Sequence, residues 1–408
     1  LAALYGLKQG SRCFNILMHN FLIDKCGLIQ SANDPCIYML RTPAHTIILA
    51  IFVDDIVVTT PSKRSVDWLR NKLQGRFSMT DQGAVKLILG MHVTRDRSAC
   101  TLTLDQSRYI NDFLHRYGMD SCNPSPSPAD NKSRLSKSQA PSTPEEEAKV
   151  SREKHKYASL IGSALYAALS SRFDISFAVN NAARHAAWPG PAHFRAIKRT
   201  FRYLRGSHTY CVQHGKSATE GLVSTPRLYA YTDSDWAGNP DDRSSTSCHI
   251  IYFCGGPVQA TTRRLKCIAL SSTDAEYYSL SDTARELTHI RRLAADIMGK
   301  EIKGPTQIMV DNSASMKIAE SEVCSRRSKH IELRYHHIRQ LITNKTVTLV
   351  KIDTLYNLAD IGTKSLPTPR FMFLRDRIMA KKAAGVKWHR PMDSEERQFY
   401  DRLFGLRM

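Results

Sequence analysis

The sequence has no long run of apolar residues. Its longest run, Ile47 to Val53, is far shorter than the ~18 residues that a membrane-spanning helix needs, and two aspartates follow it. The start of the chain also lacks the basic and then apolar pattern of a signal peptide, and its first residue is Leu1 rather than Met. We therefore expect no membrane span and no secretory leader, and we expect the chain to be part of a longer protein.

The absence of Cys-x-x-Cys pairs and the low number of acidic residues narrow the class of protein further. The ten cysteines never occur as the Cys-x-x-Cys pair of zinc ribbons and knuckles, so free thiols in a reducing intracellular compartment are expected, with cytoplasm and nucleus not distinguished. Acidic residues are few relative to basic ones, since 58 Lys and Arg against 38 Asp and Glu give a net charge of +20. This imbalance indicates a polyanionic partner, either nucleic acid or an anionic membrane surface.

Composition and periodicity predict five segments. Residues 123–156 hold five prolines, seven serines and no aromatic residue, which predicts a Pro/Ser-rich linker or long loop with a short polar helix at Glu145–Lys154. Before this segment, residues 1–122 mix helical and strand patterns, and after it residues 157–226 are helical. Residues 227–375 begin with strands and then alternate helix and strand, and residues 376–408 form a basic extension.

Four acids in the segment 227–375 share one kind of position. Asp233 and Asp311 each end an apolar strand, Glu276 opens a helix on the stripe that faces the core, and Asp360 follows a further strand. Carboxylates that converge at one sheet edge repel one another unless cations neutralise them, and oxygen ligands select Mg²⁺ or Mn²⁺. Two such ions, about 4 Å apart, could promote phosphodiester hydrolysis. A single Asp at a strand end is more often a turn former or a helix cap, so this prediction depends on the whole set.

A second acidic pair, Asp54 and Asp55, lies between two apolar stretches. Residues Thr46–Val53 and Ile56–Thr60 predict two strands joined by a tight turn at the two aspartates. An Asp-Asp pair in a hairpin is usually a solvated turn. Because the flanking strands are apolar enough to be buried, the two carboxylates could instead be held rigidly for Mg²⁺ and a nucleotide.

Basic residues gather on two predicted helices. The last helix of the segment 157–226 has apolar residues on one face and cations on the other, which is either a solvated surface or a phosphate contact, and the charge of +20 favours phosphate. In Lys329–Arg339, His330 and His337 fall on one helical face, but no further ligand completes a metal site, so a basic helix near the substrate path or a solvated surface is favoured. The residues that we assign to nucleic-acid contact are Arg195, Lys198, Arg199, Arg202, Arg205, Arg263, Arg264, Lys329, His330 and Arg334.

These motifs together resemble the C-terminal part of the Pol polyprotein of copia-type LTR retrotransposons. Leu4–Gln9 resembles the family's LYGLKQ segment, and Phe52–Asp55 resembles its YVDD polymerase box. Tyr231–Gly238 resembles YSDADWAG, Ala269–Tyr277 resembles ALSSTEAEY, and Ala359–Lys364 resembles ADILTK. The resemblance implies a partial polymerase palm and thumb-like region joined to a ribonuclease H-like mixed-sheet α/β domain.

The resemblance also implies residue roles and partners. It assigns Asp233, Glu276, Asp311 and Asp360 to a two-metal ribonuclease H site with Mg²⁺ or Mn²⁺, and it assigns Asp54 and Asp55 to the polymerase metals. The implied partners are RNA/DNA hybrids, other nucleic acid and the rest of the Pol polyprotein. The family's first polymerase aspartate lies upstream of LYGLKQ, so we expect an incomplete polymerase site in this chain.

Two hypotheses of different classes follow. The first is metal-dependent hydrolysis of the RNA strand of RNA/DNA hybrids, with RNA-directed DNA polymerase function belonging to the full-length parent. The alternative is a remnant that binds nucleic acid through its charge but has lost its chemistry. An integrase-type transferase is disfavoured, because the sequence lacks the usual zinc-binding His-Cys module. An assay on an RNA/DNA hybrid separates the first two.

Overall fold

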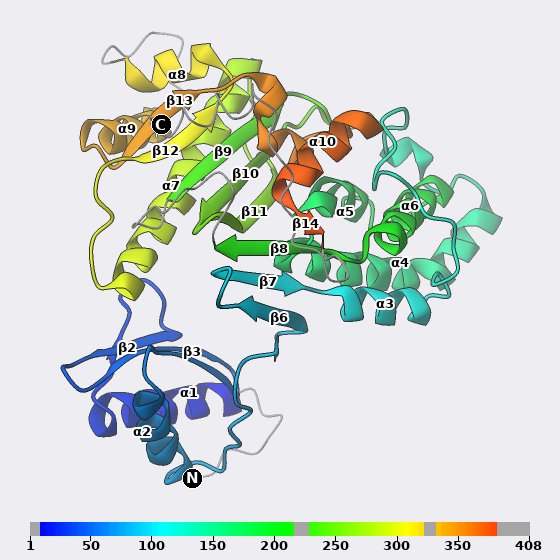
Figure 1. Cartoon of the computed structure of the whole chain (residues 1–408). Helices are drawn as coiled ribbons and strands as arrows, with labels where there is room; N and C mark the ends of the chain where they lie inside the picture. The colour runs from blue at the N-terminus through cyan, green and yellow to red at the C-terminus, as the bar shows by residue number, and fades with distance from the viewer. Residues whose placement is uncertain (1–8, 216–227, 322–331, 382–408) are drawn as a thin grey trace. The chain divides into compact units, whose positions relative to one another are not determined.

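The computed structural model describes residues 9–215, 228–321 and 332–381, which form a mixed α/β fold (Figure 1). The chain divides into two compact units. Unit 1 combines residues 1–85 with residues 288–303, and unit 2 combines residues 86–287 with residues 304–408. This division does not follow the five segments expected from composition, whose boundaries stay predictions. No helix in the described ranges is both long and apolar enough to cross a membrane.

Unit 1 is built on a four-stranded antiparallel sheet. Its elements are α1 (Gly10–Asn20), a π-helical turn (Phe21–Lys25), β1 (Ile29–Gln30), β2 (Ile37–Arg41), β3 (Thr46–Phe52), β4 (Asp55–Thr59), α2 (Lys63–Gln74) and the last turns of α7 (Ser272–Met298), with strand order β1-β2-β3-β4. Ile47, Leu49 and Ile51 alternate along β3 and are buried. They pack in one cluster with Met18 of α1 and Leu69 of α2, so the helices cover one face of the sheet.

The end of α7 is held by polar contacts within unit 1. The Asp296 carboxylate accepts hydrogen bonds from Ser31 Oγ at 2.5 Å and from Asn33 Nδ2 at 2.8 Å. Arg41 Nη2 donates to the carbonyl oxygens of Asp296 and Ile297, at 2.8 and 2.7 Å. The last carbonyls of a helix have no partner within the helix, and a cation there is favourable. Arg41 therefore caps α7 from strand β2.

Unit 2 contains a second antiparallel sheet and a group of helices. The elements are β5 (Leu87–Ile88), β6 (Met91–Asp96), β7 (Thr101–Asp105), α3 (Ser107–Arg116), α4 (Pro144–Ser170), α5 (Ser176–Ala183), α6 (Pro191–Ser207), β8 (Tyr210–Gly215), α10 (Thr368–Ile378) and β14 (Ala380–Lys381), with strand order β14-β8-β7-β6-β5. Phe113 of α3, Tyr157 of α4 and Phe201 of α6 are fully buried in one cluster. The aromatic positions of these helices thus form the core between them.

The segment 123–156 is more ordered than the expected linker or long loop, and the short helix expected at Glu145–Lys154 lies within the longer α4. The last part of the segment is helical, because α4 already begins at Pro144, behind an N-cap in which Thr143 Oγ1 accepts from the Glu146 amide. Its first part is irregular but packed, since Ser125 and Ser127 are buried. Hydrogen bonds to α6, such as that from Thr200 Oγ1 to the Pro128 carbonyl, and the burial of Leu135 in the core hold this part. Composition gives no sign of these hydrogen bonds.

The third sheet carries the acids singled out in the sequence. It contains β9 (Leu228–Asp235), β10 (Thr246–Phe253), β11 (Gly256–Arg264), β12 (Thr306–Val310) and β13 (Val347–Lys351) in the order β11-β10-β9-β12-β13, together with α7, α8 (Ser313–Glu320), α9 (Glu332–Thr343) and a 3₁₀ turn, η6 (Leu358–Gly362). β9, β10 and β11 are antiparallel, whereas β12 is parallel to both β9 and β13. Residues Lys266–Leu270, which follow β11, form no strand.

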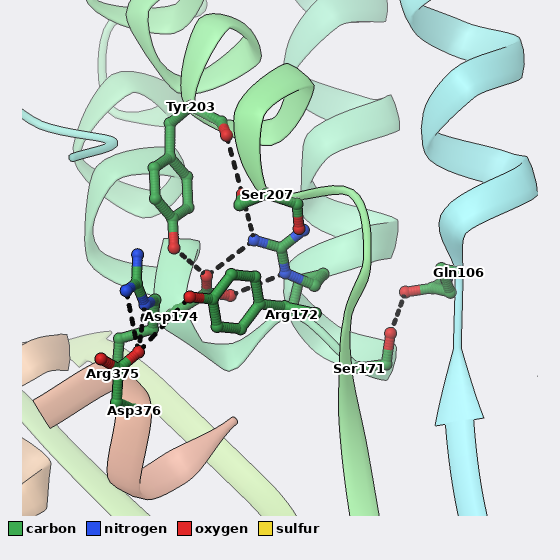
Figure 2. A network of polar contacts seen from close by, with 9 residues as sticks. Gln106, Ser171, Arg172, Asp174, Tyr203, Ser207, Arg375 and Asp376 are labelled. Atoms are coloured by element: carbon green, nitrogen blue, oxygen red, sulfur yellow. Dashed lines mark hydrogen bonds and ion pairs between the residues drawn. The ribbon is translucent and has the colours of Figure 1, made fainter. Parts of the chain in front are cut away.

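A buried polar network joins the helices of unit 2 (Figure 2). Arg172 lies just after α4, and its guanidinium pairs with the Asp174 carboxylate. Ser207 at the end of α6 accepts from Arg172 through its carbonyl at 2.9 Å and through Oγ at 2.8 Å. Tyr203 OH donates to Asp174 Oδ2 at 2.5 Å. Each of these side chains is therefore satisfied without water.

Candidate active site

Three carboxylates meet at the sheet edge where β9 and β12 end. Asp233 lies in β9, Asp311 directly follows β12, and Glu276 lies in the second turn of α7. Because β9 and β12 are parallel neighbours, their carboxyl ends lie at the same edge. One carboxylate oxygen from each of Asp233, Glu276 and Asp311 lies within 4.8 Å of the other two. The three side chains thus form a compact carboxylate cluster.

The fourth predicted acid, Asp360, is not part of this group of three. It lies in η6, where Lys364 Nζ is 2.8 Å from Oδ1 and Arg370 Nη2 is 3.2 Å from Oδ2. The Asp360 carboxylate is therefore neutralised by cations of the chain itself. It still lies close enough to act on Asp233, since its charge raises the pKa of that carboxyl.

Burial and mutual repulsion disfavour the charged form of two of the acids. Burial, and then the charge of Asp360, raises the pKa of Asp233 to about 7, although Lys364 and a 2.6 Å hydrogen bond from Thr363 Oγ1 oppose this. Burial, followed by the charges of Asp233 and Asp311, raises the pKa of Glu276 well above its ordinary value. The cluster is thus short of positive charge.

One oxygen of Glu276 gives an independent indication of what fits here. Glu276 Oε1 accepts from the Ser234 amide at 3.2 Å, whereas Oε2 is buried and has no hydrogen-bond donor in the described part of the chain. A buried carboxylate oxygen without a donor is costly unless a cation binds it. Three carboxylates with a free oxygen among them match the all-oxygen donor set of Mg²⁺ or Mn²⁺.

The second acidic pair lies at the tip of a hairpin in unit 1. Strand β3 ends at Phe52, which pairs with Asp55 as the first residue of β4, so Val53 and Asp54 form the turn. The turn thus begins one residue earlier than the sequence predicts. Both aspartates are exposed, and within the described ranges no third acid joins them in a metal-binding group. Val53 has φ of +55°, an unusual value for a β-branched residue.

The cations expected to contact phosphate have varied surroundings. On α6, Arg199 Nη2 donates to Ser127 Oγ at 3.1 Å, Arg202 Nε donates to the Asn123 carbonyl at 2.7 Å, and Arg205 Nε donates to the Asp120 carbonyl. Arg199 and Arg202 thus contact the segment expected to be a linker, while the Arg202 side chain stays exposed.

The remaining predicted cations differ in exposure and in their partners. Arg195 and Lys198 are exposed on α6. Arg263 lies 3.5 Å from Glu286, and Arg264 lies 2.8 Å from Asp242. Lys329 and His330 fall outside the described residues, as does any metal site that would include His330. Arg334 lies on α9, where its side chain is not described.

Sequence reasoning missed the cations that neutralise Asp360. Lys364 follows Asp360 by four residues, a spacing that places two side chains of a helical turn on the same side, so this partner had a local signal. Arg370 comes from α10, whose approach to η6 depends on the tertiary fold. No local pattern in the sequence indicates that Arg370 pairs with Asp360.

Comparison with known proteins gives one matching family model and several similar proteins. Residues 2–131 match the family described as reverse transcriptase (RNA-dependent DNA polymerase). The chain is 33% identical over 377 residues to the retrovirus-related Pol polyprotein from transposon TNT 1-94 of Nicotiana tabacum, covering 92% of this chain and 28% of that protein. Over 92% of its length the chain is similar to Pol polyproteins of copia-type retrotransposons. The predicted resemblance is confirmed.

A second Pol polyprotein and a solved structure are also similar. The Pol polyprotein from transposon RE1 of Arabidopsis thaliana is 31% identical over 376 residues, which cover 92% of this chain and 24% of that protein. The chain therefore spans about a quarter of the length of these curated relatives. The crystal structure of LC11-RNase H1 in complex with RNA/DNA hybrid is 15% identical, with a TM-score of 0.26, and covers 34% of this chain and 94% of that one.

Proposed function

We propose that the chain is the reverse transcriptase and ribonuclease H part of a retrotransposon Pol polyprotein, and that it hydrolyses the RNA strand of RNA/DNA hybrids with Mg²⁺ or Mn²⁺. The observation that carries the proposal is the convergence of Asp233, Glu276 and Asp311 at the ends of two parallel strands. The mixed five-stranded sheet around them is the kind of sheet expected of a ribonuclease H-like domain.

The carboxylates and their neighbours have separable roles. Asp233, Glu276 and Asp311 would hold the divalent ions. Bound there, the ions would activate a water and stabilise the leaving oxygen. Lys364 favours the charged form of Asp233, because its positive charge lowers the pKa that burial raises. Thr363 Oγ1 donates to Asp233 Oδ2, which leaves the other carboxylate oxygen of Asp233 for a ligand.

The polymerase activity belongs in this proposal to the full-length parent protein. Asp54 and Asp55 would bind the polymerase metals there, with a further acid from outside this chain. Exposed carboxylates on a hairpin tip are accessible to a nucleotide and its ions, which supports this assignment. The rest of the Pol polyprotein is the implied partner. We further propose a reducing intracellular location, since all nine cysteines described have free thiols.

Cleavage of a hybrid that is labelled on its RNA strand tests the nuclease. We expect the parent chain to cut the RNA strand with Mg²⁺ or Mn²⁺ and to leave duplex DNA uncut, because 2′-hydroxyl contacts and groove shape distinguish the two substrates. Asp311→Asn keeps the shape but removes one anionic ligand. Loss of one such transition-state contact costs ~2.7–4 kcal/mol, or a factor of 10²–10³ in rate.

Asp353→Asn is the matched control. Asp353 is an exposed acid that caps the next 3₁₀ turn through the Leu355 amide, and Asn can cap it equally well. We expect its cleavage rate to equal that of the parent. Equal rates for Asp311→Asn and the parent would refute the carboxylate site. A parent that cuts with neither metal would favour the alternative, a binding remnant without chemistry.

A further inference from the structure

Lys364 is the less firmly held of the two cations that neutralise Asp360. The other cation, Arg370, also donates to the Thr354 carbonyl at 2.6 Å and to the Leu355 carbonyl, so three acceptors fix its guanidinium. Within the described ranges, Lys364 Nζ lies within ion-pairing distance of no carboxylate other than Asp360, and its side chain is 40% exposed. Breaking this one ion pair would therefore release the Lys364 ammonium into solvent.

The 3₁₀ turn η6 places Asp360 beside Asp233. Thr363 Oγ1 lies 2.6 Å from Asp233 Oδ2 and 3.2 Å from the Asp360 carbonyl, so one hydroxyl contacts both residues. Asn357, the N-cap of η6, donates through Nδ2 to the Thr232 carbonyl of β9 at 2.9 Å. These contacts hold η6 against the end of β9. A cation on Asp360 therefore lies at the border of the carboxylate cluster.

Asp360 Oδ1 is a buried oxygen that Lys364 satisfies only in part. The ammonium is close enough for an ion pair, at 2.8 Å, but Oδ1 has no hydrogen-bond donor in the described part of the chain. Among the described residues, Glu276 Oε2 is the other carboxylate oxygen that is buried without a donor. A divalent ion binds carboxylate oxygens directly and offsets the cost of burying them. The same kind of ligand would therefore satisfy both oxygens.

We infer that Lys364 is an internal counter-ion that competes with a divalent ion for Asp360, and that it must move into solvent before Asp360 and Asp233 can share that ion. The inference rests on the proposed function for the presence of the metal. A lysine suits this role, because its ammonium is a compact charge on a flexible stem that can reach water. The affinity for a second ion, more than that for the first, would then depend on Lys364.

A purely structural role for Lys364 makes a different prediction. Its ion pair with Asp360 would then only hold η6 in place, and its removal would lower the thermal stability of unit 2 without changing the binding of divalent ions. Binding measured directly, without substrate and without cleavage, therefore separates the two roles.

The test is Mn²⁺ binding, followed by the paramagnetic resonance signal of the free ion at about pH 8, which lies above the Asp233 pKa of about 7. We expect the parent to bind one ion tightly and a second one weakly. Lys364→Gln should lower the Kd of the weaker ion about tenfold and change that of the tighter ion by less than about threefold, because it removes the competitor at Asp360 only. Lys364→Arg keeps the positive charge and should bind as the parent does.

Lys345→Gln is the control for loss of one positive charge. Lys345 is exposed and precedes β13, and because β13 is parallel to β12, it lies at the end of the sheet opposite to Asp311. We expect its Mn²⁺ binding to equal that of the parent. Identical binding curves for Lys364→Gln and Lys345→Gln would overturn the competition.

Reductive methylation of lysines in the parent chain gives a second measurement, which needs no variant to fold. With Mn²⁺ present, Lys364 should react about threefold faster, because an ammonium that leaves a carboxylate loses its proton more readily. Lys345 should react at the same rate with and without the ion, as mass spectrometry of the peptides would show. A Lys364 rate that does not respond to Mn²⁺ would also overturn the competition.

The outcomes distinguish this inference from the proposed nuclease. Tighter Mn²⁺ binding by Lys364→Gln in a chain that never cuts RNA would support the competition and refute the nuclease. A chain that cuts RNA while Lys364→Gln binds Mn²⁺ as the parent does would do the reverse. Failure of both parent and variant to bind Mn²⁺ would refute both proposals.

Discussion

Arg172 and Asp174 form an ion pair in which neither side chain has any exposed surface. Arg172 Nε lies 3.0 Å from Asp174 Oδ1, and Nη2 lies 2.7 Å from Oδ2, so the pair is bidentate (Figure 2). The remaining hydrogen bonds of both groups go to the end of α6, through Ser207 and Tyr203. The pair therefore joins the end of α4 to the end of α6. The contribution of this ion pair to stability depends on both partners being present.

Asp174→Asn should destabilise unit 2 by about 3–5 kcal/mol, because it leaves the Arg172 charge buried without a counter-ion. Urea unfolding followed by circular dichroism measures this change. Asp112→Asn, on the exposed side of α3, removes an acid that lies 3.9 Å from Arg108 and should change stability by less than about 0.5 kcal/mol. Equal stabilities for the two variants would show that the buried pair contributes nothing specific.

His249 should lower the stability of unit 2 as the pH drops from about 6.5 to about 4, whereas the raised pKa values of Asp233 and Glu276 act in the opposite direction. His249 is buried on β10, and its Nε2 has no hydrogen-bond partner among the described groups. Burial, aided by Arg263 and Arg285 and opposed by Glu286, lowers the pKa of His249 to about 4. Between that pH and the unfolded value of about 6.5, the unfolded state binds more protons, so acid favours unfolding.

His249→Leu should lose the His249 contribution, so its free energy of unfolding should fall less than that of the parent as the pH drops. Thermal unfolding at half-unit pH steps between 4 and 7 would measure it. The control is His115→Gln, which replaces an exposed histidine of α3 and should leave the slope unchanged. Parent and His249→Leu profiles that stay parallel over this range would contradict the assignment of His249 as a neutral buried group.

Asp296→Ala should loosen the end of α7 in unit 1. An acid at a helix C-terminus is unfavourable by itself, but the Ser31 and Asn33 hydrogen bonds compensate and lower the pKa of Asp296. Because the site is partly exposed, we expect a loss of about 1 kcal/mol. Hydrogen exchange of the amides in residues 288–298 should speed up by roughly fivefold. The control is Lys300→Ala at an exposed position. Equal hydrogen-exchange protection in both variants would argue against a stabilising role for the hydrogen bonds of Asp296.

Primer extension by the chain as given should not exceed background. The exposed pair Asp54 and Asp55 has no third carboxylate beside it in the described ranges, and a two-metal polymerase site needs further ligands and groups that hold the nucleotide. Incorporation of labelled nucleotide on a primed RNA template is the measurement. Templated incorporation that disappears in Asp54→Asn would contradict the expectation and would show that another acid completes the site.

The sequence was most informative where a local pattern fixes a position. The alternating apolar residues of β9 and β12 placed Asp233 and Asp311 at strand ends, and the Ser-rich start of α7 placed Glu276 near the beginning of a helix. Periodicity carries no information on which helix approaches η6, so Arg370 was missed as a partner of Asp360. It likewise gave no sign that Arg199, Arg202 and Arg205 donate to a neighbouring segment. Such side-chain partners depend on tertiary packing.

The discontinuity of unit 1 has a consequence for dissecting the protein. Its residues come from two stretches of the sequence, 1–85 and 288–303, and the first part of unit 2, residues 86–287, lies between them. A break anywhere between residues 86 and 287 would leave β2 and its helix-capping Arg41 on one polypeptide and Asp296 on the other. The two fragments would have to associate before α7 regained its cap. Splitting the chain there would accordingly make a fragment-complementation pair, and no single cut can release unit 1 intact.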